Sequence, residues 1–298
     1  MDLTLFIQER MLSSWSLRGH LVMEAAGLPY AARLTPGGTP DFAAAMLRVA
    51  PPSRTAPTLV GPDGLIVWDS LALAETAAEL APDAPVWPAD QAARGWARSL
   101  AAEMHSGFTA LRGACAMNLS RRYDGFAPGA AVKADVARIE DLWRETRARF
   151  GAGGPWLFGA DFTAVDAFYA PVAARFVTYG LTADAGAQAY CAAIIAHPAF
   201  RRWRAMGVAE GPVPTRYDLD LPRLPWPGPQ TIPARAIAVA AAAPSDAVNA
   251  DCPYSGKPVV REALAEIDGR IIGFCNRFCR DKSVADAGAW PKLAPLLA

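Results

Sequence analysis

The sequence predicts an α+β protein in which a mixed α/β domain comes first, an all-helical domain follows, and a small cysteine-bearing module comes last. Three observations predict this arrangement. Strand-like and helix-like segments alternate within the first 80 residues, and helical spacing takes over after residue 90. A proline-rich stretch then precedes a final segment that contains three of the five cysteines.

The first domain, residues 1–82, is predicted from the order of its segments. An apolar, partly β-branched run at residues 3–7 predicts a buried strand, and residues 15–26 have helical spacing up to Gly27, which favours a helix end. Residues 58–68 contain two β-rich runs around a Gly/Pro/Asp turn, the pattern of a hairpin, and a helix rich in Ala and Leu follows. The order β-α-(β)-α-β-β-α is the thioredoxin-like arrangement.

The rest of the chain is predicted as three further parts. Residues 90–207 carry long Ala-, Arg- and Glu-rich segments with helical spacing, and Thr163 with Asp166 forms a capping box at a helix start. Residues 211–250 contain eight prolines, which oppose regular structure, so we expect an extended linker there. Residues 251–298 then form a compact module.

Composition narrows the classes of function. Hydrophobic residues make up 52% of the 298 residues, and 29 basic side chains balance 29 acidic ones, so neither nucleic acid nor an anionic membrane is expected as a partner. The N-terminus lacks a basic segment followed by an apolar one, and no apolar run reaches the length of a membrane helix. An odd number of cysteines fits a reducing compartment, so we expect a cytoplasmic protein.

Two serines mark the first candidate site, at the start of the first helix. The free amides and the dipole of a helix N-terminus favour an anion such as a thiolate, and a hydroxyl there favours the ionised form of a bound thiol. The alternative is that Ser13 or Ser14 is only a helix N-cap. Ser13 and Ser16 have the spacing of a Cys-x-x-Cys motif, but neither is cysteine, which excludes dithiol exchange here.

Two further candidate motifs follow in the same domain. Pro57 comes just before a predicted strand, where a cis peptide bond would turn the backbone of Ala56 outward to pair with a peptide ligand. An ordinary trans proline is the alternative. Asp69 and Ser70 open the next helix, where they either bind an amino-acid head group or simply cap the helix.

Together these motifs resemble those of bacterial glutathione transferases over residues 1–207. The resemblance is strongest in the glutathione-binding half, and it is to the serine-type classes, including the zeta class. The motifs that carry it are Ser13-Ser14-Trp15-Ser16-Leu17-Arg18, Arg54-Thr55-Ala56-Pro57, Trp68-Asp69-Ser70-Leu71-Ala72, Ala102-Glu103-Met104-His105-Ser106-Gly107-Phe108 and Asp161-Phe162-Thr163-Ala164-Val165-Asp166-Ala167.

The resemblance implies a homodimer in which Ser13 stabilises the glutathione thiolate. The residues implied to bind glutathione around it are Ser14, Ala56, Pro57, Asp69 and Ser70. The thiolate would attack a small hydrophobic electrophile held between the two domains. The candidate residues for that substrate pocket are Trp15, His105 and Phe108.

This sequence departs from the zeta pattern in one position and is ambiguous in another. Zeta-type enzymes that isomerise maleylacetoacetate have a cysteine where Trp15 stands here, which argues against that isomerase activity. Because Ser13 and Ser14 are adjacent, the sequence leaves open which of the two hydroxyls faces the thiol.

The last three cysteines indicate a second, independent site. Cys252 is followed by 22 residues, then Cys275, three residues and Cys279. If residues 274–282 are helical, Cys275 and Cys279 lie one turn apart on one face, where both can bind a metal. This spacing resembles the small TRASH and YHS metal-binding modules, which have treble-clef-like folds, although Ser255-Gly256-Lys257 replaces the cysteine that is usual in the YHS turn.

The resemblance implies a metal in this module, with zinc as the candidate, bound by Cys252, Cys275 and Cys279. Structural zinc takes four ligands, so an Asp, a water or a partner chain would have to complete the set. The alternatives are three buried thiols without a metal or, less favoured in a reducing compartment, a disulfide.

The sequence thus predicts a glutathione S-transferase whose co-substrate is glutathione. A protein of another class stays open as the alternative: a non-catalytic glutathione- or ligand-binding protein, or a metal-responsive adaptor that uses the transferase part as a scaffold.

Overall fold

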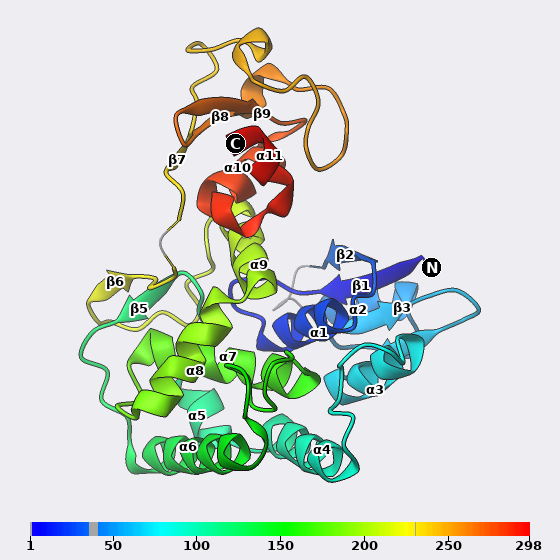
Figure 1. Cartoon of the computed structure of the whole chain (residues 1–298), viewed down its shortest axis with the longest axis vertical. Coiled ribbons are helices and arrows are strands. Elements are labelled where there is room, and N and C mark those ends of the chain that lie inside the picture. The colour runs from blue at the N-terminus through cyan, green and yellow to red at the C-terminus, as the bar shows by residue number, and fades with distance from the viewer. Residues whose placement is uncertain (1, 36–40, 230) are drawn as a thin grey trace. The chain divides into compact units, whose positions relative to one another are not determined.

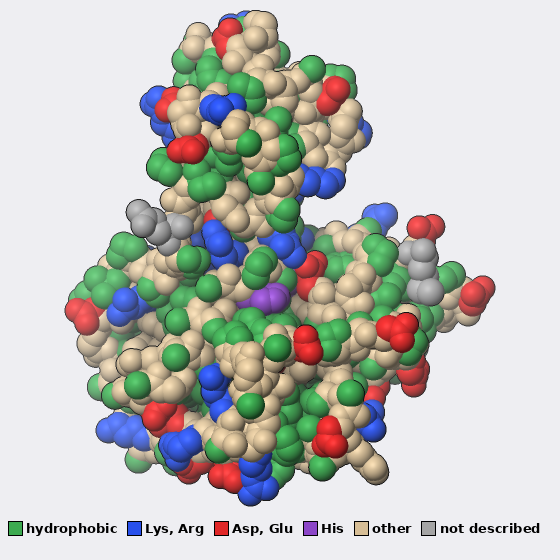
Figure 2. All heavy atoms as spheres, in the orientation of Figure 1, with side chains coloured by type: hydrophobic (Ala, Val, Ile, Leu, Met, Phe, Trp, Pro, Cys, Tyr) green, Lys and Arg blue, Asp and Glu red, His purple; other side chains and the backbone are tan. Residues whose placement is uncertain are grey.

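The computed structural model describes residues 2–35, 41–229 and 231–298, which divide into two compact units (Figure 1). The first unit runs to Ile195 and includes Thr215–Pro227, whereas the second combines Ala196–Pro214 with Gly228–Ala298. None of the described helices has both the length and the apolar character needed to span a bilayer. Acidic and basic side chains are interspersed over the face drawn in Figure 2.

The first unit begins with a four-stranded sheet in the order β2-β1-β3-β4. Its strands are β1 (Leu3–Ile7), β2 (Tyr30–Leu34), β3 (Thr58–Val60) and β4 (Ile66–Trp68). Strand β1 is parallel to β2 and antiparallel to β3, and β3 pairs with β4 as the predicted hairpin. The helices of this part are α1 (Ser14–Ala25), α2 (Asp41–Val49) and α3 (Ser70–Leu80). The predicted thioredoxin-like arrangement is confirmed.

Helix α1 lies unusually close to the loop that precedes β3. The peptide bond between Ala56 and Pro57 is cis, as the sequence suggested. A Cβ atom added to Gly19 would lie only 2.6 Å from Cβ of Pro57 and 3.7 Å from the side chain of Leu5. Because atoms cannot approach that closely, glycine at position 19 is what allows α1 to pack against this proline.

The helical part that follows is built around one buried helix. Its helices are α4 (Gln91–Ser106), α5 (Thr109–Ala114), α6 (Ala130–Phe150), α7 (Ala164–Tyr179) and α8 (Ala185–Ala196). Helix α7 is buried along nearly its whole length and starts at the predicted capping box, where Oδ2 of Asp166 accepts from the Thr163 amide at 2.9 Å. Burial raises the pKa of Asp166, but its oxygens also accept from the Leu157 amide and the Tyr190 hydroxyl, so the carboxyl is well satisfied.

Residues 211–250, where an extended linker was expected, contain two short strands. Strand β6 (Arg223–Pro225) belongs to the first unit and pairs antiparallel with β5 (Arg121–Tyr123). The sequence around β5 has helical spacing and did not predict this strand. Strand β7 (Ala234–Ala236) instead forms the edge of the sheet in the second unit. Proline is tolerated in such places because an edge strand needs partners on one side only.

The second unit contains a three-stranded sheet in the order β7-β8-β9 and the helices around it. Its remaining regular elements are α9 (Pro198–Ala209), β8 (Leu264–Ile267), β9 (Arg270–Gly273), α10 (Arg277–Ala285) and α11 (Ala294–Leu297), with single 3₁₀ turns at Pro244–Asp246, Arg261–Ala263, Ala287–Ala289 and Pro291–Leu293. Helix α9 packs against α10. The guanidinium of Arg201 on α9 also binds both carboxylate oxygens of Asp286, at 2.6 and 2.8 Å.

The predicted boundary at residue 207 differs from the division between the two compact units. Helix α9 clusters with the C-terminal module and not with the helices before it. A module of this size has little apolar core of its own, and sharing a core with one more helix is a physical way to supply it. The described core of the module includes Ile267, Ile272 and Phe274, which are completely buried.

We predict that Gly19→Ala destabilises the protein by roughly 1–3 kcal/mol, because the new methyl group overlaps the Pro57 ring and forces α1 and the loop apart. Gly95→Ala is the matched control, since Gly95 lies within helix α4 and a Cβ there meets nothing within 4 Å. That control should stabilise by about 0.5–1 kcal/mol. Chemical unfolding of both variants checks this, and equal effects of the two substitutions would contradict it.

Candidate functional site

A cavity of about 370 Å3 opens beside the cis proline, in the first unit. It is bounded by the end of β1, the start of α1, the loop before β3 and the start of α3. Its lining residues are Gln8, Trp15, Phe42, Arg54, Thr55, Ala56, Pro57, Asp69 and Ser70. Three motifs that are far apart in the sequence, and that were singled out there one by one, thus surround one space.

The loop at Pro57 presents an unpaired stretch of backbone to this cavity. Ala56 is half-buried, and its amide and carbonyl groups bond to none of the described residues. The loop is held from within, because the Thr58 hydroxyl donates to the Thr55 carbonyl at 2.7 Å and lies 2.6 Å from the Ser53 hydroxyl. A rigid backbone edge with free donor and acceptor groups is suited to pairing with a peptide.

Asp69 has a strained backbone and two distinct contacts. Its φ of 80° is in the left-handed region, which costs a non-glycine residue about 1–3 kcal/mol and is typical of functional sites. Its Oδ1 atom accepts from the Leu71 amide at 2.8 Å and so caps α3, while Oδ2 lies 3.3 Å from Nε2 of His105. Next to it, the Ser70 hydroxyl is buried and has no hydrogen-bond partner among the described residues.

Ser13 and Ser14 differ in their surroundings. Ser13 is the N-cap of α1: its hydroxyl accepts from the Ser16 amide at 3.3 Å and donates to the Ser16 hydroxyl at 2.8 Å. It is 8% exposed and does not line the cavity. Ser14 is half-buried, and its hydroxyl bonds to none of the described residues. The Ser16 hydroxyl in turn accepts from the amide of Gln8, which does line the cavity.

Trp15 lines this cavity and also contacts residues of the helical part of the unit. The ring of His105 meets it edge-on at 5.2 Å, and the guanidinium groups of Arg18 and Arg112 lie 4.4 and 5.0 Å from its ring centre. Burial lowers the pKa of His105, with Asp69 acting in the opposite direction and the two arginines adding to the decrease. Phe108, the other residue expected in a substrate pocket, is 7% exposed and lies outside the lining of this cavity.

Sequence reasoning gave no role to three arginines near the site, although one of them, Arg18, belongs to the first motif. Burial, with Arg112 and Arg175 nearby, lowers the pKa of Arg18 to about 9, and its Nε and Nη1 atoms have no partner among the described residues. An arginine at position 18 within the apolar spacing of a helix is a signal that could have been noticed. Nothing in the sequence indicated that Arg112 and Arg175 lie close to it.

A larger cavity, of about 690 Å3, lies elsewhere in the first unit, around the segment that joins α3 to α4. Trp87, Phe150 and Phe158 are among its lining residues, but none of the residues predicted for the site is. Size alone therefore does not select the candidate site, and we assign it to the smaller cavity where the motifs converge.

The three late cysteines converge in the second unit, with their sulfur atoms all within 4.8 Å of one another. Cys252 and Cys279 are buried and Cys275 is half-buried. Burial opposes ionisation of Cys252, but amide groups of Cys275, Tyr254 and Ser255 outweigh it and lower its pKa to about 7. Burial raises the pKa of Cys279 to about 12.

Polar donors and the ammonium of Lys282 lie near this trio. Sγ of Cys275 accepts from the Ser255 hydroxyl at 3.2 Å and from the Asn276 side-chain amide at 3.3 Å. The ammonium of Lys282 lies 3.7 Å from the ring centre of Tyr254 and 4.2 Å from that of Trp290. Three sulfurs supply three of the four ligands of a structural zinc, and among the described residues no fourth His, Cys, Asp or Glu joins them.

Two family models match this chain, one in the sheet domain and one in the helices that follow it. Residues 12–80 match a family model described as glutathione S-transferase, N-terminal domain, and residues 129–205 match one described as glutathione S-transferase, C-terminal domain. No protein with a curated description matches the chain.

Among solved structures, a glutathione transferase homologue from Burkholderia GL BGR1, with bound glutathione, is 21% identical at a TM-score of 0.54, covering 70% of this chain and 99% of that one. A tau class glutathione S-transferase from mango, Mangifera indica, is 17% identical at 0.53, covering 68% and 92%. A glutathione S-transferase from Rhodospirillum rubrum F11 is 20% identical at 0.51, covering 67% and 91%. At these identities the likeness shows the fold, a thioredoxin-like domain followed by a helical domain.

Proposed function

From the two glutathione S-transferase domain matches, we propose that this chain is a glutathione transferase that activates the glutathione thiol for attack on a small hydrophobic electrophile. The observation that carries the proposal is the cavity beside Pro57, where an unpaired backbone edge, a carboxylate and the start of α1 face one space. These groups match a γ-glutamyl peptide, whose ammonium suits Asp69 and whose cysteinyl backbone suits Ala56.

The chemistry assigned to the chain is stabilisation of a thiolate. The thiol proton passes to solvent, the sulfur forms a bond with the electrophilic carbon, and the leaving group departs with its electron pair. Ser13 takes part by turning its hydroxyl from Ser16 towards the sulfur, and the free amides at the start of α1 add their dipoles. The electrophile would lie against Trp15 and His105. We propose that the chain is cytoplasmic and that it forms a homodimer. Light scattering of the purified protein tests whether it is a dimer.

Glutathione binding is tested by calorimetric titration of reduced glutathione into the wild type, Asp69→Asn and Asp90→Asn. Both aspartates are helix N-caps with an acceptor 2.8 Å from a backbone amide, but only Asp69 lines the cavity. We expect Asp69→Asn to weaken binding about 10- to 100-fold, as loss of a charge-assisted hydrogen bond predicts, and Asp90→Asn to bind as the wild type does. A wild type that does not bind glutathione would refute the proposal.

The thiol-activating residue is tested by comparing Ser13→Ala with Ser14→Ala. We expect Ser13→Ala to lower the conjugation rate by roughly 10²-fold while glutathione still binds, because a donor to a developing anion is lost. It should also cost about 1 kcal/mol of stability as a lost N-cap. If Ser14→Ala abolishes conjugation and Ser13→Ala does not, the roles of the two serines are reversed. If neither variant changes a measurable rate, the chain acts without a serine.

A second candidate function is metal binding by the C-terminal module, as part of a metal-responsive adaptor on a transferase scaffold. The observation that favours it is the convergence of Cys252, Cys275 and Cys279 within 4.8 Å. Zinc bound there would hold the turn at Cys252 to helix α10 and so contribute to folding, with a fourth ligand from outside the described cluster.

Metal analysis of the purified protein checks this. We expect about one zinc per chain in the wild type and in Cys191→Ser, whose thiol is buried in helix α8, and none in Cys275→Ser. A chelator should lower the midpoint of unfolding of the zinc-containing wild type and should leave that of Cys275→Ser unchanged. A metal-free wild type that folds normally, and that zinc does not stabilise, would exclude this function.

A further inference from the structure

The segment Thr215–Pro227, which we call the strap, belongs to the first unit although the chain on both sides of it belongs to the second. It reaches two places in the first unit. Its strand β6 pairs with β5, and the Asp124 amide donates to the Pro222 carbonyl at 2.9 Å. Its other end lies against the turn between β1 and α1, which leads directly to Ser13.

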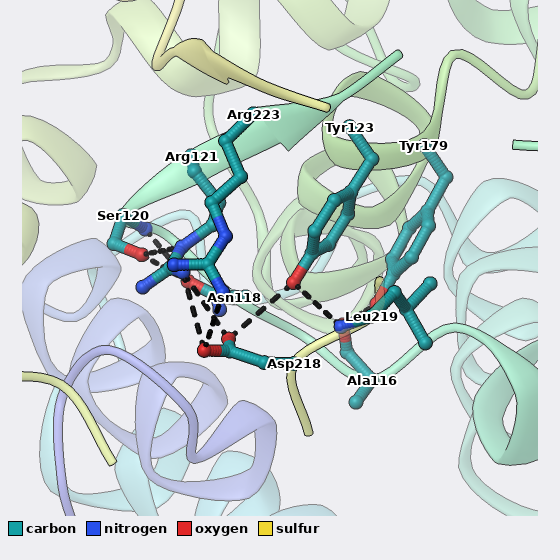
Figure 3. A network of polar contacts seen from close by, with 9 residues as sticks. All are labelled: Ala116, Asn118, Ser120, Arg121, Tyr123, Tyr179, Asp218, Leu219 and Arg223. Carbon is teal, nitrogen blue, oxygen red and sulfur yellow. Dashed lines mark hydrogen bonds and ion pairs between the residues drawn. The ribbon is translucent and has the colours of Figure 1, made fainter. Parts of the chain in front are cut away.

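Asp218 anchors the strap through a compact polar network (Figure 3). Its carboxylate lies 3.3 Å from Nη1 of Arg121 and 3.1 Å from Nη2 of Arg223, and it accepts from the Tyr123 hydroxyl at 3.4 Å. The Asp218 and Arg121 side chains are only 12% and 15% exposed, so water screens their attraction weakly. These contacts fix this part of the strap against β5.

Two residues before this anchor, the strap reaches the turn that precedes α1. Nη1 of Arg216 lies 3.3 Å from Oε1 of Glu9, and Oε2 of Glu9 is buried without a hydrogen-bond partner among the described residues. The backbone carbonyl of Glu9 accepts from the Leu12 amide at 3.3 Å and from the Ser13 amide at 2.9 Å. Glu9 therefore faces the strap through its side chain and holds Ser13 through its backbone.

The same turn is tied to the segment before β5. The Leu119 amide donates to the Met11 carbonyl at 3.1 Å, and β5 begins two residues later, at Arg121. The turn at residues 9–13 thus has an anchor on each side, Arg216 and Leu119, and both lead back to the network around Asp218. The Ser13 hydroxyl donates to the Ser16 hydroxyl. Because Ser13 is the last residue of this turn, the direction of its hydroxyl depends on how the turn is held.

We propose that Arg216, held in place by Asp218, is a positioning residue that fixes the turn before α1 through Glu9 and thereby sets the orientation of the Ser13 hydroxyl towards the bound thiol. This inference rests on the proposed function for the role of Ser13, but the hold of the strap on the turn does not. The strap is thereby part of the glutathione site, although none of its residues lines the cavity.

The expected effects are small and local, because the Arg216 and Glu9 side chains are 35% and 21% exposed. Such a pair contributes about 0.2–1 kcal/mol, which corresponds to at most about a fivefold change in a local opening equilibrium. The overall midpoint of unfolding should therefore barely move when Arg216 is replaced, and the effect has to be sought at the turn itself.

The experiment compares Arg216→Gln and Asp218→Asn with Arg223→Gln. The control removes a cation from the strap but leaves Arg121 and Tyr123 on Asp218 and leaves the Glu9 contact intact. Two quantities are measured: hydrogen exchange of the amides of residues 9–16 without glutathione, and the pKa of the thiol of bound glutathione from its thiolate absorbance.

We expect Arg216→Gln and Asp218→Asn to speed exchange of the Leu12 and Ser13 amides about two- to fivefold and to raise the thiol pKa by a few tenths of a unit, while Arg223→Gln changes neither. Unchanged exchange in both test variants overturns the hold of the strap on the turn. Faster exchange with an unchanged thiol pKa overturns its effect on Ser13. A wild type that does not bind glutathione refutes the proposed function and the role of Ser13, while the exchange result still decides whether the strap holds the turn.

Discussion

The candidate site depends on the close approach of helix α1 to the cis proline loop. Gly19 allows it, since a methyl group there would come within 2.6 Å of the Pro57 ring. This contact fixes the start of α1 relative to the backbone edge at Ala56, and the hairpin that follows Pro57 carries the chain to Asp69. The cavity is therefore a consequence of packing in the sheet domain. Its polar groups are held by a core that has no room for a residue larger than glycine at position 19.

Two of the polar side chains at the site, Ser13 and Asp69, are already partnered within the chain. The Ser13 hydroxyl donates to Ser16, and Asp69 shares its carboxylate between the cap of α3 and His105. A ligand must therefore exchange these contacts for its own, and only the difference contributes to affinity. The strained backbone of Asp69 is supported by the cap that its Oδ1 atom forms, while Oδ2 lies 3.3 Å from Nε2 of His105. The Ser13 hydroxyl and the Asp69 carboxylate are thus held in place before a ligand binds, whereas the Ala56 backbone and the Ser70 hydroxyl have no partner among the described residues.

The second unit solves a different physical problem, that of a module too small to fold on its own apolar core. It takes α9 from the end of the helical region and fixes it through the bidentate contact between Arg201 and Asp286. Two of its three clustered cysteines belong to its buried core, so a metal bound to them would act on the same packing. Between the two segments of the second unit, the chain returns to the first unit as the strap. Neither unit is therefore one continuous stretch of sequence.

The sequence by itself determined the elements whose signals are local. The hairpin at residues 58–68, the start of α3 at Asp69 and the capping box at Thr163 all follow from turn and cap chemistry that neighbouring residues supply. The three motifs around the candidate site were found in this way too. Only the tertiary structure decided that they surround one cavity, that α9 joins the C-terminal module, and that β6 pairs with β5 across about a hundred residues. Such long-range pairings leave no local pattern, because the free energy that selects them comes from burial and hydrogen bonds between segments that the sequence keeps apart.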